Sequence, residues 1–188
     1  MKIGLCITGS FCTLKNIVAV TKSIVEAGHG VVPIFSYNVS NFDTRFYKAT
    51  DFEKDIITLT GKTPIKTIVE AEPMGTSKSV DLLLVAPCTG NTLSKITLGI
   101  TDTPVTMAVK ATLRNNKPVV ISVSSNDSLG ANAKNIGHLL NTRNIYFVPF
   151  GQDDCVKKPN SLIADTSLIL PTCEMAIQGK QIQPLFYT

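Results

Sequence analysis

Five short apolar segments recur along the chain, and each is typical of a strand that is buried on both faces of a sheet. They are Ile3–Ile7, Val31–Phe35, Asp81–Val85, Pro118–Ser122 and Asn144–Val148. Pro33 interrupts the second segment, and proline cannot donate a hydrogen bond to a neighbouring strand. We therefore expect this strand to lie near an edge of the sheet.

Amphipathic segments lie between these strands and predict helices. Apolar residues recur at helical spacing from Ile17 to Ala27, and Gly28 marks the end of that helix. The same spacing is found in Phe52–Leu59 before Gly61, Ile65–Val69 before Glu72-Pro73, Leu93–Ile100, Ile136–Leu140, and Leu162–Ile177 with an interruption at Pro171. Alternating strands and helices predict an α/β fold, a single three-layer domain over residues 1–188 with a mainly parallel Rossmann- or flavodoxin-like sheet.

Composition narrows the possible functions. The chain has 188 residues, of which 44% are hydrophobic and 17% charged, as expected for one globular domain. Its net charge is +4, but the 18 basic residues are scattered, which argues against a nucleic-acid partner. The five cysteines form no C-x-x-C pair, so we expect neither a disulfide framework nor a metal site. With no leader-like or membrane-spanning segment, we expect a cytoplasmic protein.

Candidate ligand residues follow the first two strands, because ligands of parallel sheets bind at the carboxyl ends of the strands. Thr8, Gly9 and Ser10 follow the first strand and precede a helix, where hydroxyls and free amides suit a phosphate. The alternative is that a hydroxyl there only caps the helix. Ser36 follows the second strand and suits a phosphate or a ring edge, although polar residues are ordinary in such loops.

The segment after the third strand is the richest in candidate residues. Pro87, Cys88, Thr89, Gly90, Asn91 and Thr92 form a loop of small residues that runs into a helix. Small side chains let a planar ligand approach the backbone, and amides at the helix start can bind an anion. A plain strand-to-helix turn is the alternative. We expect Cys88 to fill the turn as a small apolar side chain and not to act as a reactive thiol.

Residues 81–95 resemble the P-A-S-A-N-T signature of the flavin-containing cysteine decarboxylase superfamily of flavoproteins. The resemblance implies an FMN site formed by Thr8, Gly9, Ser10, Ser36 and residues 87–92. It also implies a homo-oligomer. Two features depart from that superfamily: Pro73–Ser77 contains no histidine, and Ser122–Asp127 replaces a P-x-M-N motif. Oxidative decarboxylation of a cysteine substrate is therefore not expected.

A second resemblance covers nearly the whole chain and points to the family of dipicolinate synthase B subunits. It is carried by the segments 4–12, 41–46, 59–61, 86–95, 101–105, 110–116 and 150–161. This resemblance implies an oxidoreductase subunit that acts with an A subunit, in the mother-cell cytoplasm of a sporulating bacterium, to oxidise dihydrodipicolinate to dipicolinate. NADP on the A subunit is a further expected cofactor.

If the substrate is a dicarboxylate, basic residues near the ligand end of the sheet are candidates for binding its carboxylates. Arg45 follows the second strand, and Lys157 and Lys158 follow the fifth, so each is a candidate for binding a carboxylate. Asn126 and Asp127, after the fourth strand, are further candidates for contacting substrate or flavin. The basic residues can instead be surface charges or anchors for the partner. No catalytic residue is assigned.

Two other functions remain open at this point. The chain can be a non-catalytic subunit with a vacant flavin fold that stabilises or assembles the A subunit, which the altered P-x-M-N segment favours. It can also be a decarboxylase for another substrate, which the absent histidine disfavours. Retained FMN separates the oxidoreductase from the scaffold, and release of carbon dioxide from a candidate acid is what the third function requires.

Overall fold

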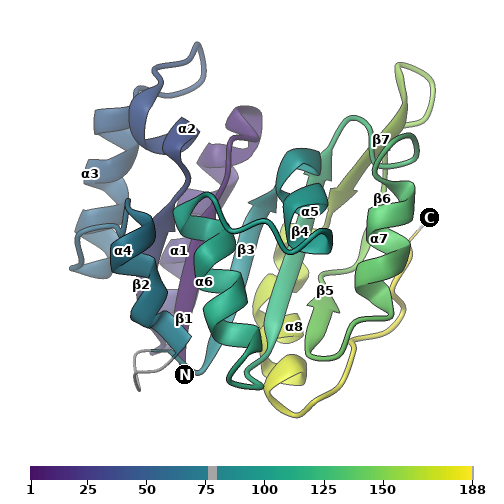
Figure 1. The fold of residues 1–188 in the computed structure, drawn as a ribbon. Coiled ribbons are helices and arrows are strands. Elements are labelled where there is room, and N and C mark those ends of the chain that lie inside the picture. The colour runs from purple at the N-terminus through teal and green to yellow at the C-terminus, as the bar shows by residue number, and fades with distance from the viewer. Residues whose placement is uncertain (76–79, 188) are drawn as a thin grey trace.

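A central sheet organises the computed structural model, which describes residues 1–75 and 80–187 (Figure 1). The strands are β1 (Lys2–Ile7), β2 (Gly30–Phe35), β3 (Leu82–Cys88), β4 (Val119–Ser125), β5 (Ile145–Phe147), β6 (Phe150–Asp154) and β7 (Lys158–Ala164). The order β2-β1-β3-β4-β5 is parallel throughout. The last residues of β4 pair with β7 in antiparallel fashion, and β6 pairs with β7 in the same way.

Helices cover both faces of this sheet. They are α1 (Leu14–Glu26), α2 (Tyr37–Asn41), α3 (Ala49–Thr60), α4 (Ile68–Ala71), α5 (Gly90–Thr97), α6 (Pro104–Leu113), α7 (Ala133–Leu140) and α8 (Ile169–Ile177), with short 3-10 turns η1 (Phe11–Thr13), η2 (Glu72–Gly75) and η3 (Thr166–Leu168). In Figure 1, α4, α5, α6 and α7 lie in front of the sheet, and α1 and α8 lie behind it. The predicted three-layer α/β architecture is confirmed.

Burial explains why the strands could be recognised. All seven residues of β3 are buried, and five of the six in β1, so these central strands have no solvent-facing side. The placement of Pro33 is also confirmed, since β2 is the first strand in the sheet order. Beyond β2 the described residues contribute only an isolated bridge between Ile34 and Ile65. The predicted helix ends hold too, because Gly28 and Gly61 adopt positive φ values of 82° and 66°.

The last third of the chain differs from the sequence prediction. We expected a loop after the fifth strand and then one apolar helical stretch from Leu162 to Ile177. The structure instead forms the hairpin of β6 and β7, with Lys158 as the first residue of β7 and Lys157 in the turn. Helix α8 begins only at Ile169, and Pro171 fits its first turn, where no intrahelical donor is needed.

Two further predictions are corrected, and one helix was missed. Pro87 and Cys88 belong to β3, with a register shift after Val85, so the expected Pro-led loop shrinks to Thr89. Helix α5 ends at Thr97, and Ile100 lies beyond it. Helix α6 was not predicted, because seven of its ten residues are buried and no polar face shows in the pattern.

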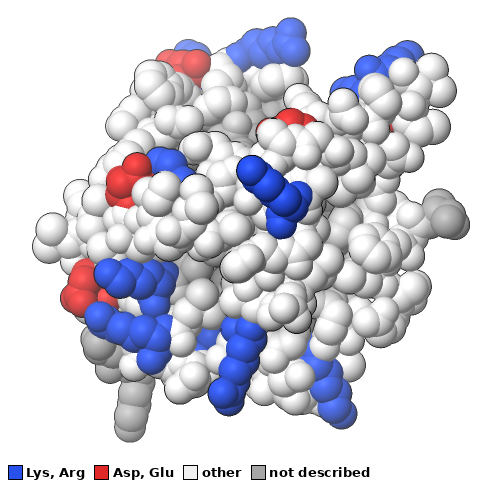
Figure 2. All heavy atoms as spheres, turned by 45° about the vertical axis from the view of Figure 1, so that its right-hand side comes forward, with Lys and Arg blue, Asp and Glu red and all other residues white. Residues whose placement is uncertain are grey.

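Surface charge follows the sequence expectation of a scattered distribution. Figure 2 shows Lys and Arg side chains spread over one face, with a small group at lower left that lies beside acidic side chains. None of the helices in residues 1–75 and 80–187 has the length and apolar character needed to cross a membrane. Thr76 and Ser77, part of the stretch without the superfamily's histidine, lie outside the described residues.

Candidate functional site

A cavity of about 670 Å³ opens at the carboxyl ends of β1, β3 and β4. In the strand order β2-β1-β3-β4, β2 is added on one side of β1, and β3 and β4 are added on the other side. The order in which the parallel strands are added therefore reverses between β1 and β3, and sheets of this type bind ligands at that point. The lining residues come from four loops and the hairpin: Gly9, Ser10, Phe11, Cys12, Thr13, Arg45, Phe46, Thr89, Gly90, Asn91, Ser124, Ser125, Asn126, Asp127, Asp153, Lys158, Ser161, Leu162 and Ile163.

The hydroxyl of Thr8 joins the two central loops. It donates a hydrogen bond to the carbonyl of Pro87 at 2.7 Å and accepts one from the amide of Thr89 at 3.1 Å. Ser10 is tied in turn to the end of β4, through a 2.8 Å hydrogen bond with Ser124. Thr8 is 1% exposed, so its side chain fixes the cavity floor and does not line it.

Residues whose backbone amides have no acceptor among the described residues line the cavity in both central loops. The amides of Phe11 and Cys12 start η1, and those of Gly90 and Asn91 start α5. Within the described residues these four amides have no acceptor, as expected for the first turn of a helix. Two helical starts with unpaired donors create a local environment that favours an anion.

A polar network packs directly behind Gly90. Asp127 accepts hydrogen bonds from Ser125 at 2.5 Å and from Asn132 at 2.7 Å. Asn132 in turn accepts from Ser94 of α5 at 2.9 Å and from Asn135 at 2.8 Å. Asn132 and Asn135 are only 3% and 7% exposed, so these amides hold α5 against the start of α7 from inside the protein.

Sequence reasoning missed Asn132, Asn135 and Ser94. A usable signal was present, because Asn132 and Asn135 are spaced by three and precede the apolar positions of a predicted helix on the same face. Buried polar side chains require partners, so two asparagines on a core-facing stripe predict a network.

Arg45 and Phe46 are held over the cavity by a rigid turn. The Thr44 hydroxyl accepts from the amides of Phe46 and Tyr47 at 3.2 Å each, and the Thr44 amide donates to the Tyr47 carbonyl at 2.9 Å. The guanidinium carbon of Arg45 lies 4.8 Å from the centroid of the Phe46 ring. This turn therefore presents an arginine and an aromatic ring to the cavity.

A hydrogen bond from Tyr47 to Asp55 of α3 anchors the same turn, and this bond predicts that the stability of the fold depends on pH. The Tyr47 hydroxyl donates to Asp55; this bond first, and then burial, raises the pKa of Tyr47 from 10.0 to about 12. A raised pKa in the folded state stabilises the fold fully below the unfolded value, and the contribution is lost as pH rises from 10 toward 12.

We therefore expect Tyr47→Phe to be less stable than the natural protein at pH 8, and the difference to shrink at pH 11. Urea unfolding at both pH values measures it. Tyr37, an exposed phenol that has no side-chain hydrogen bond among the described residues, provides the matched Tyr37→Phe control. A difference that grows with pH contradicts this account of the anchor.

The hairpin forms the remaining wall of the cavity. Lys158 makes a 2.6 Å ion pair with Asp153, and this hydrogen bond is the main reason that the pKa of Lys158 is raised. Ser161 donates to the side-chain oxygen of Asn126 at 3.4 Å, which joins the hairpin to the end of β4. Leu162 and Ile163 add apolar surface. The wall therefore combines a neutralised charge pair with a surface suited to a ring.

Nine of the candidate residues line this cavity, and six do not. The nine are Gly9, Ser10, Arg45, Thr89, Gly90, Asn91, Asn126, Asp127 and Lys158. The other six are Thr8, Ser36, Pro87, Cys88, Thr92 and Lys157. Ser36 caps α2 by accepting from the Val39 amide, Cys88 is fully buried with its thiol pKa raised by burial, and Lys157 is exposed at the hairpin turn. The ligand roles of the nine stay predictions.

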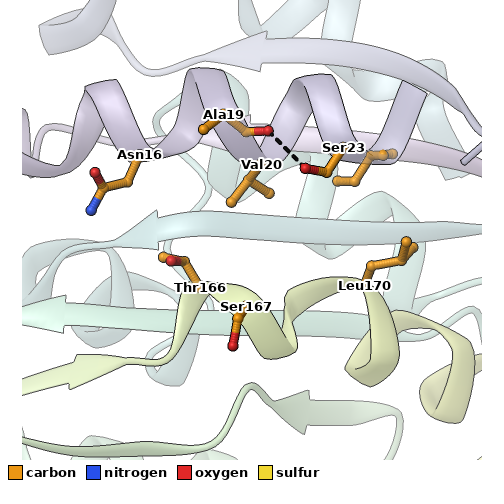
Figure 3. A pocket seen from close by; sticks show the side chains of 8 residues that line it. Asn16, Ala19, Val20, Ser23, Thr166, Ser167 and Leu170 are labelled. Atoms are coloured by element: carbon orange, nitrogen blue, oxygen red, sulfur yellow. Dashed lines mark hydrogen bonds between the residues drawn. The ribbon is translucent and has the colours of Figure 1, made fainter. Parts of the chain in front are cut away.

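A second hollow lies away from the strand ends, between α1 and the η3–α8 segment (Figure 3). It has a volume of about 390 Å³ and is lined by Asn16, Ala19, Val20, Ser23, Ile24, Thr166, Ser167 and Leu170. None of these side chains is charged, and none was predicted to bind a ligand. The cavity at the strand ends is therefore the candidate site.

Comparisons with known proteins show which family the chain resembles. The flavoprotein family matches residues 1–168. Over 184 residues the chain is 45% identical to the dipicolinate synthase B subunit of Bacillus subtilis (strain 168), covering 98% of this chain and 92% of that protein. The crystal structure of the dipicolinate synthase B subunit from Bacillus halodurans superposes with a TM-score of 0.91 at 41% identity, covering 100% of this chain and 96% of the other.

A more distant structure shares the fold. The FMN-dependent cysteine decarboxylase SpaF has a TM-score of 0.69 at 18% identity, covering 95% of this chain and 97% of SpaF. The match over nine-tenths of the chain to the flavoprotein family and the similarity to two B subunits over nearly the whole chain establish the family. The chain belongs to the flavoprotein family and, within it, to the dipicolinate synthase B subunits.

Proposed function

We propose that this chain binds FMN in the cavity at the strand ends and acts with an A subunit to oxidise dihydrodipicolinate to dipicolinate. The name of the Bacillus subtilis relative supports the reaction, and the FMN dependence in the name of SpaF supports the cofactor. The observation that carries the proposal is the pair of helical starts at η1 and α5, whose residues line one cavity and carry amides without an acceptor among the described residues.

The cavity fits the cofactor in size and chemistry. Its volume of about 670 Å³ lies within the range of roughly 300–1,000 Å³ that is usual for cofactor sites. Phosphate suits the free amides of Phe11 and Cys12 or of Gly90 and Asn91. Leu162 and Ile163 offer an apolar wall for a ring system.

The reaction removes a hydride and a proton from the dihydropyridine ring and leaves an aromatic pyridine. Bound flavin would supply an acceptor for the hydride, and NADP is the further cofactor that we propose for the A subunit. The residues of this chain bind the dicarboxylate, orient its ring carbon and exclude water from the cavity. Within the described residues, no group of His, Cys, Asp and Glu side chains is placed to hold a metal ion, and the proposal requires none.

Absorbance after desalting tests the proposal most directly. The protein is incubated with FMN, passed through a desalting column and scanned in the visible range, while calorimetry measures the heat of FMN binding. Flavin bands at about one equivalent are expected. A colourless protein that evolves no heat contradicts the flavin proposal and favours the non-catalytic scaffold for the A subunit.

Assembly and location are proposed on the same basis. Co-purification with the A subunit tests the partnership, and light scattering tests a homo-oligomer. Leu98 and Ile100, after α5, are 71% and 41% exposed, and Ile100 lines an apolar groove against α6. Exposed apolar surface of this kind suits a contact between subunits. A cytoplasmic location in the mother cell completes the proposal.

A further inference from the structure

Among the described residues, the cavity contains one charged side chain without a charged or hydrogen-bonded partner. Four charged side chains line it: Arg45, Asp127, Asp153 and Lys158. Asp153 and Lys158 pair with each other, and both oxygens of Asp127 accept hydrogen bonds from Ser125 and Asn132. In residues 1–75 and 80–187, the Arg45 side chain makes no ion pair and no hydrogen bond. It contacts the Phe46 ring instead.

The turn that carries this arginine is fixed without using the donors of its side chain. The turn is fixed by the Thr44 hydroxyl and by the Asp43 carboxylate, which accepts from the Ala49 amide at 2.9 Å. A guanidinium held over a ring face keeps its in-plane N–H groups free, and these groups match the two oxygens of a carboxylate. Arg45 is exposed, so these donors are accessible to a ligand carboxylate.

A further free donor lies across the cavity. Arg45 follows β2, Asn126 follows β4, and β1 and β3 lie between them in the sheet. The side-chain oxygen of Asn126 accepts from Ser161, whereas its amide nitrogen has no acceptor among the described residues. The strands β2 and β4 are three strand spacings apart, about 14 Å, and a long side chain such as that of Arg45 suits a ligand that spans part of this width.

We propose that Arg45 is the specificity-determining residue that binds one carboxylate of the dicarboxylate, with the Asn126 amide placed for the opposite end. This inference rests on the proposed function for the identity of the diacid. It also selects Arg45 over Lys157 and Lys158 as the basic residue that binds the carboxylate. Lys158 is neutralised by Asp153, and Lys157 lies outside the cavity.

Calorimetric titration with dipicolinate tests this role in the full chain, with and without added FMN. Arg45→Gln is expected to weaken dipicolinate binding about 10-fold to 100-fold, because a charge-assisted hydrogen bond to a carboxylate is lost. Arg45→Lys restores part of the affinity, since it keeps the charge without the fork of donors. Arg143→Gln is the matched control, as Arg143 is exposed before β5 and lies outside the cavity.

Two readouts make the result specific. Thermal unfolding and FMN retention of Arg45→Gln should match those of the natural protein, which separates ligand binding from folding. Picolinate, which lacks one carboxylate, should lose less affinity than dipicolinate when Arg45 is replaced. A merely structural arginine would weaken both ligands equally.

Each contrary outcome overturns the inference. Equal dipicolinate affinity in Arg45→Gln, equal loss in Arg143→Gln, or no dipicolinate binding by any variant excludes the proposed role. Loss of FMN retention with dipicolinate binding intact assigns Arg45 to the phosphate of the cofactor instead. A colourless natural protein that still binds dipicolinate through Arg45 contradicts the flavin proposal alone and leaves this inference standing.

Discussion

Replacing Gly90 with alanine is expected to abolish flavin retention and to lower the stability of the fold. A Cβ at this position would lie 2.4 Å from an oxygen of Asp127 and 2.6 Å from both the Ser125 hydroxyl and the Asn132 amide nitrogen. These side chains are short and are bonded to one another, so none can move without breaking the network. The first turn of α5, with its free amides, must then shift away from the cavity floor.

The magnitude follows from overpacking. Forcing a methyl group into a well-packed site costs roughly 1–3 kcal/mol. For a chain of this size each kcal/mol lowers the melting temperature by about 2–4 °C, which differential scanning calorimetry resolves. A loss of only about 1.4 kcal/mol in the free energy of flavin binding lowers the affinity tenfold, so we expect the flavin affinity to fall at least about 10-fold. Absorbance after desalting measures that loss.

Gly9→Ala is the matched control, because the same methyl group is added on the other central loop. Its Cβ would lie 3.4 Å from Asn38 and from the Phe11 ring, an ordinary packing distance. We expect this variant to melt close to the natural protein. Equal behaviour of the two variants would show that the network behind Gly90 yields freely, contrary to the structure.

The parallel part of the fold could be predicted because its strands are buried on both sides. Segments such as Ile3–Ile7 and Leu82–Val85 are buried and almost entirely apolar, and their strand assignment needs no knowledge of the rest of the chain. The β6–β7 hairpin could not be found this way. Its outer residues, among them Gln152 and Asp153, are solvent-exposed or paired across the hairpin, so the local pattern resembles a loop.

The candidate site was predicted where it depends on sheet topology and missed where it depends on tertiary contacts. Gly9, Gly90 and Asn91 follow the ends of parallel strands, and strand ends can be located from sequence. That Lys158 is paired and Arg45 is not depends on the positions of distant segments, which no local pattern records. The sequence therefore proposed three basic candidates, and the geometry distinguishes among them.

Replacing Asn132 is expected to have the second large effect, because its side chain connects Asp127 at the cavity to Ser94 of α5. Its side chain bonds to Asp127, Ser94 and Asn135, at 2.7, 2.9 and 2.8 Å. Asn132→Leu keeps the approximate volume but leaves these partners without their hydrogen bonds in a site that is nearly closed to water.

Leaving buried polar groups unpaired costs roughly 1–3 kcal/mol, so Asn132→Leu should melt several degrees lower. Asn141→Leu, the same substitution at an exposed position at the end of α7, should change stability by less than about 0.5 kcal/mol. Because Asp127 would lose one of its two donors, the Asn132 variant should also lose flavin affinity, whereas the Asn141 variant should not. Thermal unfolding that is unchanged in Asn132→Leu would mean that water replaces the lost donors, and the network would then have no part in positioning α5.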